Sequence, residues 1–345
     1  MCLQDDAGLP AGLGEAGRLS SRWDKHDRDV EDFDRPRRRT RPRTKEHPDY
    51  SALPVARVIS VDRGRYRCLL EGRPVTAVRG RLINRKGGII VGDNVRLDGD
   101  VTGDEGSLSR IVEVIERSTV LRRSADDADS FERPIVANAD QLFIVTALAD
   151  PPPRTGMIDR ILVAAFDAKI RPVLCLTKSD LASPDELKRA YEPLGVPIVV
   201  TEPDADLTQI REAIQGRVTV FVGHSGVGKS TLVNRLIPDA NRATAEVSEL
   251  TGKGRHTSTS AVAMEVPGGG WIIDTPGVRS FGIMHVSPES LVGAFTDLRE
   301  FAEDCARGCK HETGAVDCAF DDAVADGRLS QERLASFRRM EAAFI

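Results

Sequence analysis

At 345 residues the chain is long enough for two or three domains, and its 40% hydrophobic and 29% charged residues exclude a wholly disordered or collagen-like protein. It contains no run of about 18 apolar residues and begins with neither a basic nor an apolar signal region, so we expect no transmembrane helix, no signal peptide and a cytoplasmic protein. The formal net charge of −5 argues against a uniformly basic nucleic-acid-binding protein, but it leaves room for a local basic patch.

Residues 1–50 are predicted to form a disordered basic arm. The run Arg35–Lys45 combines many cationic residues with two prolines, a composition that does not favour a helix or a strand. Two interpretations stay open for this arm. It is either a solvated tail or a segment that neutralises RNA phosphates in a salt-dependent way.

Residues 51–120 are predicted to form a small closed β-barrel, with an OB-fold as the leading candidate. Short β-rich runs alternate here with glycine-containing turns, a pattern typical of such barrels. The predicted strands are Val55–Val61, Tyr66–Leu70, Pro74–Val78, Asn94–Leu97 and Gly106–Ile115. Many arginines in this segment favour RNA as a partner, although the pattern alone also fits a purely structural module.

Residues 121–287 are predicted to form an α/β domain with a mostly parallel, doubly wound sheet, because short apolar strands alternate with helices. The predicted strands are Leu142–Ala147, Pro172–Leu176, Ile198–Val200, Val218–Val222, Ala261–Val266 and Trp271–Ile273. The predicted helices are Met157–Ala168, Pro184–Glu192, Leu207–Ile214 and one that begins near Lys229.

The strongest motif in this domain is a phosphate-binding loop. Its sequence, which matches G-x-x-x-x-G-K-[ST], is Gly223, His224, Ser225, Gly226, Val227, Gly228, Lys229 and Ser230. The alternative is an incidental glycine-rich turn. The loop lies directly between a predicted strand and a predicted helix, and this context favours a phosphate-binding loop. Its backbone N–H groups can surround a β-phosphate at the helix N-terminus. Lys229 is expected to reach the β- and γ-phosphates, Ser230 to bind Mg²⁺, and Thr231 to lie in the same nucleotide site.

Two further motifs favour GTP over ATP. Asp274-Thr275-Pro276-Gly277 follows a predicted strand, where Asp274 can hold Mg²⁺ through water and the Gly277 N–H can meet the γ-phosphate. The guanine-reading motif Thr177-Lys178-Ser179-Asp180 follows another strand, and Asp180 can accept hydrogen bonds from N1–H and the 2-amino group of guanine. Adenine has no N1–H and would leave this carboxylate unpaired, which argues against the more distant alternative of a P-loop kinase or ATPase.

Residues 288–345 are predicted to form a small helical domain that contains a metal site. The candidate ligands are Cys305, Cys309, His311 and Cys318. Three thiolates and one imidazole satisfy tetrahedral Zn²⁺ and leave no open position, so we expect one structural zinc ion. The alternative is that these are ordinary buried cysteines, but the other cysteines of the chain show no comparable grouping.

The order of the motifs is unusual, because the guanine-reading motif precedes the phosphate loop and Asp274–Gly277 comes last. With a predicted barrel before these motifs and a Cys/His cluster after them, residues 50–345 resemble the RsgA/YjeQ family of circularly permuted GTPases. The resemblance implies an OB-fold, a permuted GTPase domain and a zinc-binding helical domain. It also implies slow GTP hydrolysis that is stimulated by the small ribosomal subunit, during late maturation of that subunit.

The resemblance further implies a switch segment, since Gly252–Thr259 is similar to the first switch of the family. Thr257 or Thr259 would then bind Mg²⁺. Many GTPases place Gln after Asp-x-x-Gly to orient the attacking water, but Val278 stands there and cannot hydrogen-bond. His256 is the candidate replacement as a catalytic residue, with Lys229 and Thr257, although its imidazole would equally suit stabilising the loop or contacting RNA.

The expected cofactors are Zn²⁺ and Mg²⁺, and the expected partners are the small ribosomal subunit, its rRNA and other assembly factors, with a monomeric protein and no membrane. One departure from the usual GTPase pattern is Thr177, which stands where Asn is common. The alternative function is that of a nucleotide-binding regulatory module that acts on a protein partner, with incidental hydrolysis.

Overall fold

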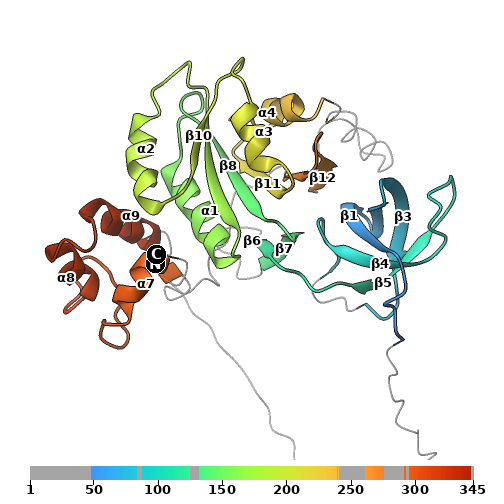
Figure 1. The fold of residues 1–345 in the computed structure, drawn as a ribbon, viewed down its shortest axis with the longest axis horizontal. Helices are drawn as coiled ribbons and strands as arrows, with labels where there is room; N and C mark the ends of the chain where they lie inside the picture. The colour runs from blue at the N-terminus through green and yellow to red at the C-terminus, as the bar shows by residue number, and fades with distance from the viewer. Residues whose placement is uncertain are drawn as a thin grey trace, which may run out of the picture. The chain divides into compact units, whose positions relative to one another are not determined.

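The computed structural model describes residues 48–83, 88–124, 132–238, 240, 261–275, 291–292 and 295–342 (Figure 1). Several sequence predictions lie outside the described residues. They concern the basic arm up to residue 47, the switch with His256, Thr257 and Thr259, and the positions of Gly277 and Val278. None of the helices in the described ranges is both long and apolar enough to span a bilayer.

Five strands form a barrel, as predicted. They are β1 (Val55–Asp62), β2 (Arg65–Leu70), β3 (Arg73–Arg79), β4 (Asn94–Gly99) and β5 (Ser109–Val114). They pair in the order β1-β2-β3-β5-β4, and β4 pairs back onto β1 to close the barrel. Every second side chain of β1 and β2 points inward, and Val58, Cys68, Leu97 and Ile111 are fully buried. The alternation of apolar and polar residues is therefore explained by one buried face.

A two-stranded hairpin follows the barrel and was not predicted. Strand β6 (Val120–Ser124) pairs antiparallel with β7 (Glu132–Ala137). Charged residues and Pro134 interrupt the apolar alternation here, and proline within a run argues against a strand. The apolar residues Leu121 and Val136 are buried and lie opposite each other in the hairpin, and they are the sequence feature that could have indicated it.

The central sheet has the strand order β10-β9-β8-β11-β13-β12, in which only β12 is antiparallel to its neighbour. The strands are β8 (Gln141–Ala147), β9 (Arg171–Thr177), β10 (Ile198–Val200), β11 (Val218–Gly223), β12 (Val262–Glu265) and β13 (Trp271–Asp274). All seven residues of β8 are buried, as expected for a strand covered on both faces. The predicted parallel sheet is confirmed.

Helices cover the two faces of this sheet (Figure 1). The helices are α1 (Thr155–Asp167), α2 (Asp185–Tyr191), the 3₁₀ turn η2 (Glu192–Leu194), α3 (Thr208–Ile214) and α4 (Lys229–Leu236). Apolar residues of α1 and α2 pack in one core cluster with Leu142 and Ile144 of β8. Residues of α3 and α4 pack in a second cluster with Phe143 and Val145, the alternate residues of the same strand.

The C-terminal part of the chain is helical, as predicted. Its helices are α7 (Thr296–Ala302), α8 (Ala319–Ala325) and α9 (Gln331–Glu341). Phe320 and Phe337 are fully buried, and their rings meet edge to face with centroids 5.6 Å apart. These side chains belong to the same core cluster as α1, so this helical module shares its core with the central sheet. The exact domain boundaries at 50, 120 and 287 stay predictions.

Candidate nucleotide site and metal centre

The ends of four neighbouring parallel strands bring the three nucleotide motifs to one edge of the sheet. Thr177 lies beside Ala147 in the register of β9 and β8, while Gly223 lies beside Val145 and Asp274 beside Phe221. From β8 the chain proceeds to β9 and β10 on one side, and β11 then pairs on the other side of β8. Ligands of α/β sheets bind in the crevice at such a reversal, and the phosphate loop follows β11 at this point.

Glycine is required at two points of the phosphate loop. A Cβ at Gly223 would lie 2.4 Å from the carbonyl oxygen of Val145, so no larger residue fits between the strand ends. Gly228 has a φ of +86° and precedes the first residue of α4. No side chain caps this helix N-terminus, and the N–H groups of its first turn therefore remain available for a phosphate.

A cation and a carboxylate meet at the centre of the site. The Lys229 ammonium forms an ion pair with the carboxylate of Asp274, and both side chains are largely buried. Thr275, which is buried, donates a hydrogen bond of 2.9 Å to the carbonyl of Phe221 and thereby fixes the chain after Asp274. Ser230 and Thr231 are exposed in the first turn of α4. This arrangement can place a lysine at the phosphates and a carboxylate at an associated magnesium ion.

The predicted guanine-reading motif, Thr177–Asp180, forms a loop after β9, which we call the guanine-reading loop. The side chain of Thr177 joins it to the phosphate loop. Its hydroxyl donates a hydrogen bond of 2.7 Å to the carbonyl of Val227 and lies 3.2 Å from that of Thr146. Thr177 is buried, so its hydroxyl joins two loops rather than facing solvent. Lys178 donates to the carbonyl of Asp150. Sequence reasoning identified Thr177 but not this contact.

The remaining residues of the guanine-reading loop leave the carboxylate of Asp180 exposed to solvent. The Ser179 N–H donates to the carbonyl of Thr201 at 3.3 Å, and its hydroxyl donates to Glu202 at 3.4 Å. These contacts hold the loop against the segment that follows β10. Asp180 is exposed and therefore accessible to a base.

We predict that Thr177→Val weakens the binding of GDP and GTP alike, by about tenfold. Valine has a similar shape but leaves the carbonyl of Val227 without its donor, at a cost of about 1–3 kcal/mol. Calorimetry should show this loss with an unchanged preference for guanine over adenine nucleotides. Thr177→Ser, which keeps the hydroxyl, is the control. Unchanged affinity in the valine variant would show that the contact between the loops does not support nucleotide binding.

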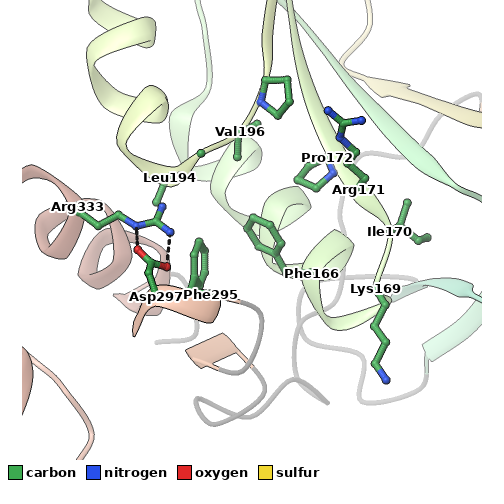
Figure 2. Close-up of a pocket in the computed structure, with 12 residues that line it drawn as sticks. Phe166, Lys169, Ile170, Arg171, Pro172, Leu194, Val196, Phe295, Asp297 and Arg333 are labelled. Carbon is green, nitrogen blue, oxygen red and sulfur yellow. Dashed lines mark hydrogen bonds and ion pairs between the residues drawn. The ribbon is translucent and has the colours of Figure 1, made fainter. Parts of the chain in front are cut away.

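A separate cavity of about 540 Å³ lies at the other end of β9, beside Arg171 and Pro172 (Figure 2). It also contacts Phe295, Asp297 and Arg333 of the helical module. Because β9 runs from Arg171 to Thr177, this cavity lies away from the strand end that carries the guanine-reading loop.

The barrel carries a cleft of about 500 Å³ with a cationic lining. It contains Arg79, Arg81 and Arg110 together with a tyrosine, Tyr50, and one acidic residue, Asp98. Sequence reasoning counted Arg79 and Arg81 among many arginines. It did not single out Tyr50 and Arg110, which are distant in the chain and meet only in the folded barrel.

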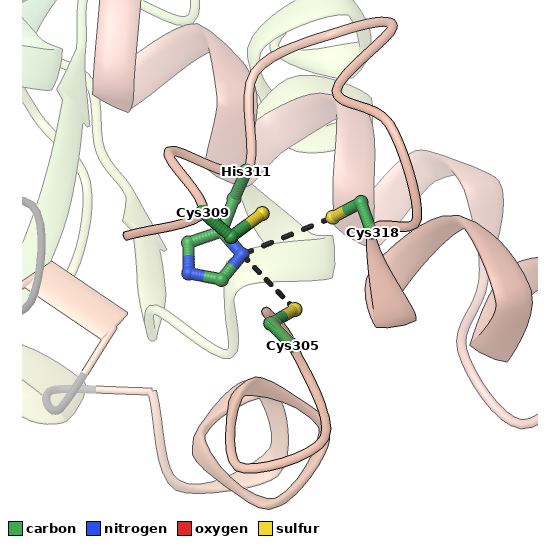
Figure 3. Close-up of side chains that lie close together, drawn as sticks. All are labelled: Cys305, Cys309, His311 and Cys318. Atoms are coloured by element: carbon green, nitrogen blue, oxygen red, sulfur yellow. Dashed lines mark hydrogen bonds between the residues drawn. The ribbon is translucent and has the colours of Figure 1, made fainter. Parts of the chain in front are cut away.

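The four predicted zinc ligands converge on one point (Figure 3). Their ligand atoms all lie within 4.8 Å of one another. The Nδ1 atom of His311 is 3.5 Å from Sγ of Cys305 and 3.8 Å from Sγ of Cys318. Tetrahedral zinc with typical bond lengths separates sulfur and nitrogen ligands by about 3.6 Å. The donor set and its spacing therefore fit a zinc ion, as the cysteine and histidine pattern predicts.

Neighbouring groups orient these ligands. The His311 ring stacks on Phe320 with centroids 4.4 Å apart, and Arg338 donates a hydrogen bond of 2.8 Å to the His311 carbonyl. The N–H of Ala319 donates to Sγ of Cys305 at 3.3 Å. Burial and the adjacent sulfur atoms raise the pKa of Cys305 to about 11, so that a bound cation is what favours its thiolate. Such supporting contacts are typical of structural metal sites.

Comparisons with known proteins agree with this geometry. Residues 114–284 match the family model described as RsgA GTPase. The chain is 42% identical over 241 residues to the Small ribosomal subunit biogenesis GTPase RsgA of Ectopseudomonas mendocina, an alignment that covers 67% of this chain and 69% of that protein. The protein of the same name from Pseudomonas aeruginosa strain LESB58 is 39% identical over 249 residues, covering 70% of this chain and 72% of that protein.

Two solved structures resemble the whole arrangement. The crystal structure of YjeQ from Thermotoga maritima matches with a TM-score of 0.63 and 27% identity, and the match covers 84% of this chain and 98% of that one. The structure of YloQ, described as a circularly permuted GTPase, matches with a TM-score of 0.61 and 27% identity, covering 88% of this chain and 97% of that one. The circular permutation inferred from the motif order of this chain is thus also the description given for a solved structure of the same fold.

Proposed function

This chain belongs to the RsgA GTPase family, and we propose that it is a GTP-hydrolysing factor in late maturation of the small ribosomal subunit. The observation that carries the proposal is the convergence of three motifs at one sheet edge: the phosphate loop, the Asp274 carboxylate and the loop Thr177–Asp180. Relatives named for biogenesis of the small ribosomal subunit support the choice of partner.

In the proposed site, the N–H groups of the phosphate loop and Lys229 hold the β- and γ-phosphates. Ser230 and Asp274 would hold Mg²⁺, with Thr257 or Thr259 as a further ligand. The bound ion would neutralise charge that develops on the phosphate oxygens. Asp180 selects guanine, and the Gly277 N–H meets the γ-phosphate. The zinc ligands Cys305, Cys309, His311 and Cys318 stabilise the helical module and leave no position for substrate.

We further propose that His256 positions the attacking water. The prediction is that His256→Ala lowers subunit-stimulated turnover by roughly 10²-fold while GTP affinity stays within about twofold, since general bases contribute on this order. Single-turnover hydrolysis with and without small subunits measures both quantities. Full stimulated turnover in this variant would assign His256 to another role, such as an RNA contact.

The cationic cleft of the barrel is the proposed RNA-binding surface. Arginines bind phosphates, and an aromatic ring such as that of Tyr50 offers a stacking surface for an unpaired base. We predict that Arg79→Glu combined with Arg81→Glu weakens binding to isolated small subunits by at least about tenfold and flattens its salt dependence. Cosedimentation across a salt series tests this. Arg63→Glu, a single charge reversal in the exposed turn between β1 and β2, is the control, to be compared with Arg79→Glu and Arg81→Glu singly.

The proposed function as a whole is tested by cosedimentation with small and large subunits in GTP, in GDP and without nucleotide. Binding to the small subunit that depends on GTP, together with stimulated hydrolysis, is the expected result. Tight GTP binding with no subunit binding in any state would instead favour the alternative, a nucleotide-dependent regulator of a protein partner.

A further inference from the structure

One face of α9 contacts the end of α2 and the 3₁₀ turn η2 that follows it through a row of donors. Arg333, Ser336 and Arg339 are spaced by three residues and therefore lie on one side of the helix. Arg333 donates a hydrogen bond of 2.6 Å to the carbonyl of Pro193. Ser336 and Arg339 donate to the carbonyl of Ala190 at 3.2 and 3.1 Å. We call these three residues the α9 clamp.

The clamp supplies what the end of α2 lacks. The last carbonyls of a helix have no partner within it, and cationic groups there interact favourably with the helix dipole. Helix α2 has seven residues and continues directly into η2, and a helix this short is marginal by itself. Donors from α9, nearly 150 residues away in sequence, therefore stabilise this segment.

Both arginines of the clamp are held in place by further contacts. Arg333 forms two hydrogen bonds with Asp297, of 2.9 and 2.8 Å, and lies over the ring of Phe295 (Figure 2). Arg339 lies over the ring of Tyr191, the last residue of α2, and donates to Asp159 of α1 at 3.2 Å. These contacts fix the arginines as rigid donors.

The contact between α1 and α9 depends on the ion pair of Arg339 with Asp159. The carboxylate of Asp159 is almost completely buried, and among the described residues one of its oxygens has no hydrogen-bond partner. Burial raises the pKa of Asp159, and the charge of Arg339 opposes that rise. A buried carboxylate without its cation is costly, so α1, α2 and α9 are held together at this point.

The other end of α2 begins directly after the guanine-reading loop. Four residues separate Asp180 from Asp185, the first residue of α2, and they form short turns. The N–H of Leu181 donates to the carbonyl of Lys178, and that of Asp185 to the hydroxyl of Ser183. With so short a connection, the position of α2 constrains where the carboxylate of Asp180 lies, together with the contacts of Thr177 and Ser179.

We propose that Arg333, Ser336 and Arg339 are positioning residues for guanine recognition. The zinc-bearing helical module holds α2, and α2 holds the guanine-reading loop, so that docking of the module and binding of the base support each other. This inference rests on the proposed function of the site. Such coupling is reciprocal, because each event stabilises the same arrangement of α2. This coupling runs from α9 through α2 to the guanine-reading loop and does not involve the switch segment.

The test compares the full-length chain with its Arg333→Ala/Arg339→Ala variant. Coupling free energies of this kind change affinity by about 5–150-fold. We expect GDP affinity to fall by about tenfold, with faster amide exchange in residues 177–194. The preference for GDP over inosine diphosphate, which lacks the 2-amino group, should fall by at least about fivefold. In the unmodified chain, GDP should slow amide exchange in α9.

Controls separate positioning from general destabilisation. Arg328→Ala removes an exposed arginine of the same module, paired with Asp326, and should leave all three readouts unchanged. Ser336→Ala removes one donor without uncovering Asp159 and should show a smaller effect in the same direction, even if the double variant unfolds. Arg339→Lys keeps the positive charge beside Asp159 and should retain more of the GDP preference than Arg339→Ala.

Two outcomes would overturn the inference. One is a clamp variant with normal exchange in residues 177–194, and the other is weaker GDP binding with an unchanged preference over inosine diphosphate. In either case guanine binding by the unmodified chain would leave the proposed function standing. Absence of any guanine preference in the unmodified chain would instead reject the proposed function itself.

Discussion

Asp180→Asn is expected to convert a guanine site into a xanthine site. In the proposed site the Asp180 carboxylate would accept hydrogen bonds from N1–H and the 2-amino group of guanine, whereas an asparagine amide can donate to the oxygen that replaces the 2-amino group in xanthine. A site built around specific hydrogen bonds rejects a ligand that lacks their partners by roughly 10⁴-fold. We therefore expect the variant to lose GDP affinity by about this factor and to gain affinity for xanthosine diphosphate. The exposure of Asp180 makes the base accessible to it in either form.

Competition calorimetry with guanosine, xanthosine and adenosine diphosphates measures this change. The matched control is Asp185→Asn, which alters an exposed carboxylate at the start of α2, five positions along the chain. It should leave the preference for GDP intact. If the unmodified protein bound ATP and GTP equally, Asp180 would not be the residue that reads the base.

The placement of the three motifs at one sheet edge could be predicted from sequence because its determinants are local. The phosphate loop needs a strand, a glycine-rich turn and a helix in immediate succession, and all three are adjacent in the chain. The parallel sheet then brings Thr177 and Asp274 to the same edge without further information. The barrel strands could also be predicted from the sequence, because each has one buried and one exposed face and its apolar and polar residues therefore alternate.

Other features depend on contacts between distant residues and could not be predicted in this way. The bond from Thr177 to the Val227 carbonyl joins two loops that are 50 residues apart. The contact of Arg339 with Asp159 spans 180 residues and requires the docked helical module. In the β6–β7 hairpin, Pro134 and the charged residues obscured a weak local pattern that only pairing makes clear.

Removing zinc is expected to unfold the helical module. The ring of His311, one of the four ligands, packs against the buried rings of Phe320 and Phe337, so the metal ligands are part of the core of this module. In small zinc domains the apparent free energy of metal binding is about 10–16 kcal/mol and is in effect folding free energy. Cys309→Ser combined with His311→Ala leaves two of four ligands and should abolish stoichiometric zinc.

Metal analysis and amide exchange in α8 and α9 detect this unfolding directly. Lys310→Ala, an exposed position between the two replaced ligands, is the control and should retain zinc. GTP binding should persist in the zinc-free variant, because the phosphate loop and Asp274 lie on the central sheet. The decrease in GTP affinity should not exceed the tenfold decrease that we expect when the α9 clamp is removed.

The zinc-free variant also identifies the element that couples the ribosome to hydrolysis. Gly277 precedes the helical module in the chain, and the zinc ligands of that module lie between α7 and α8, so contact with the γ-phosphate can bias how this module is held. Loss of the module should therefore remove subunit stimulation while basal hydrolysis continues. The informative quantity is the ratio of stimulated to basal turnover at saturating GTP, because this ratio is insensitive to a moderate loss of nucleotide affinity. An undiminished ratio would mean that the subunit acts on the GTPase site without the helical module, and that zinc serves its stability alone.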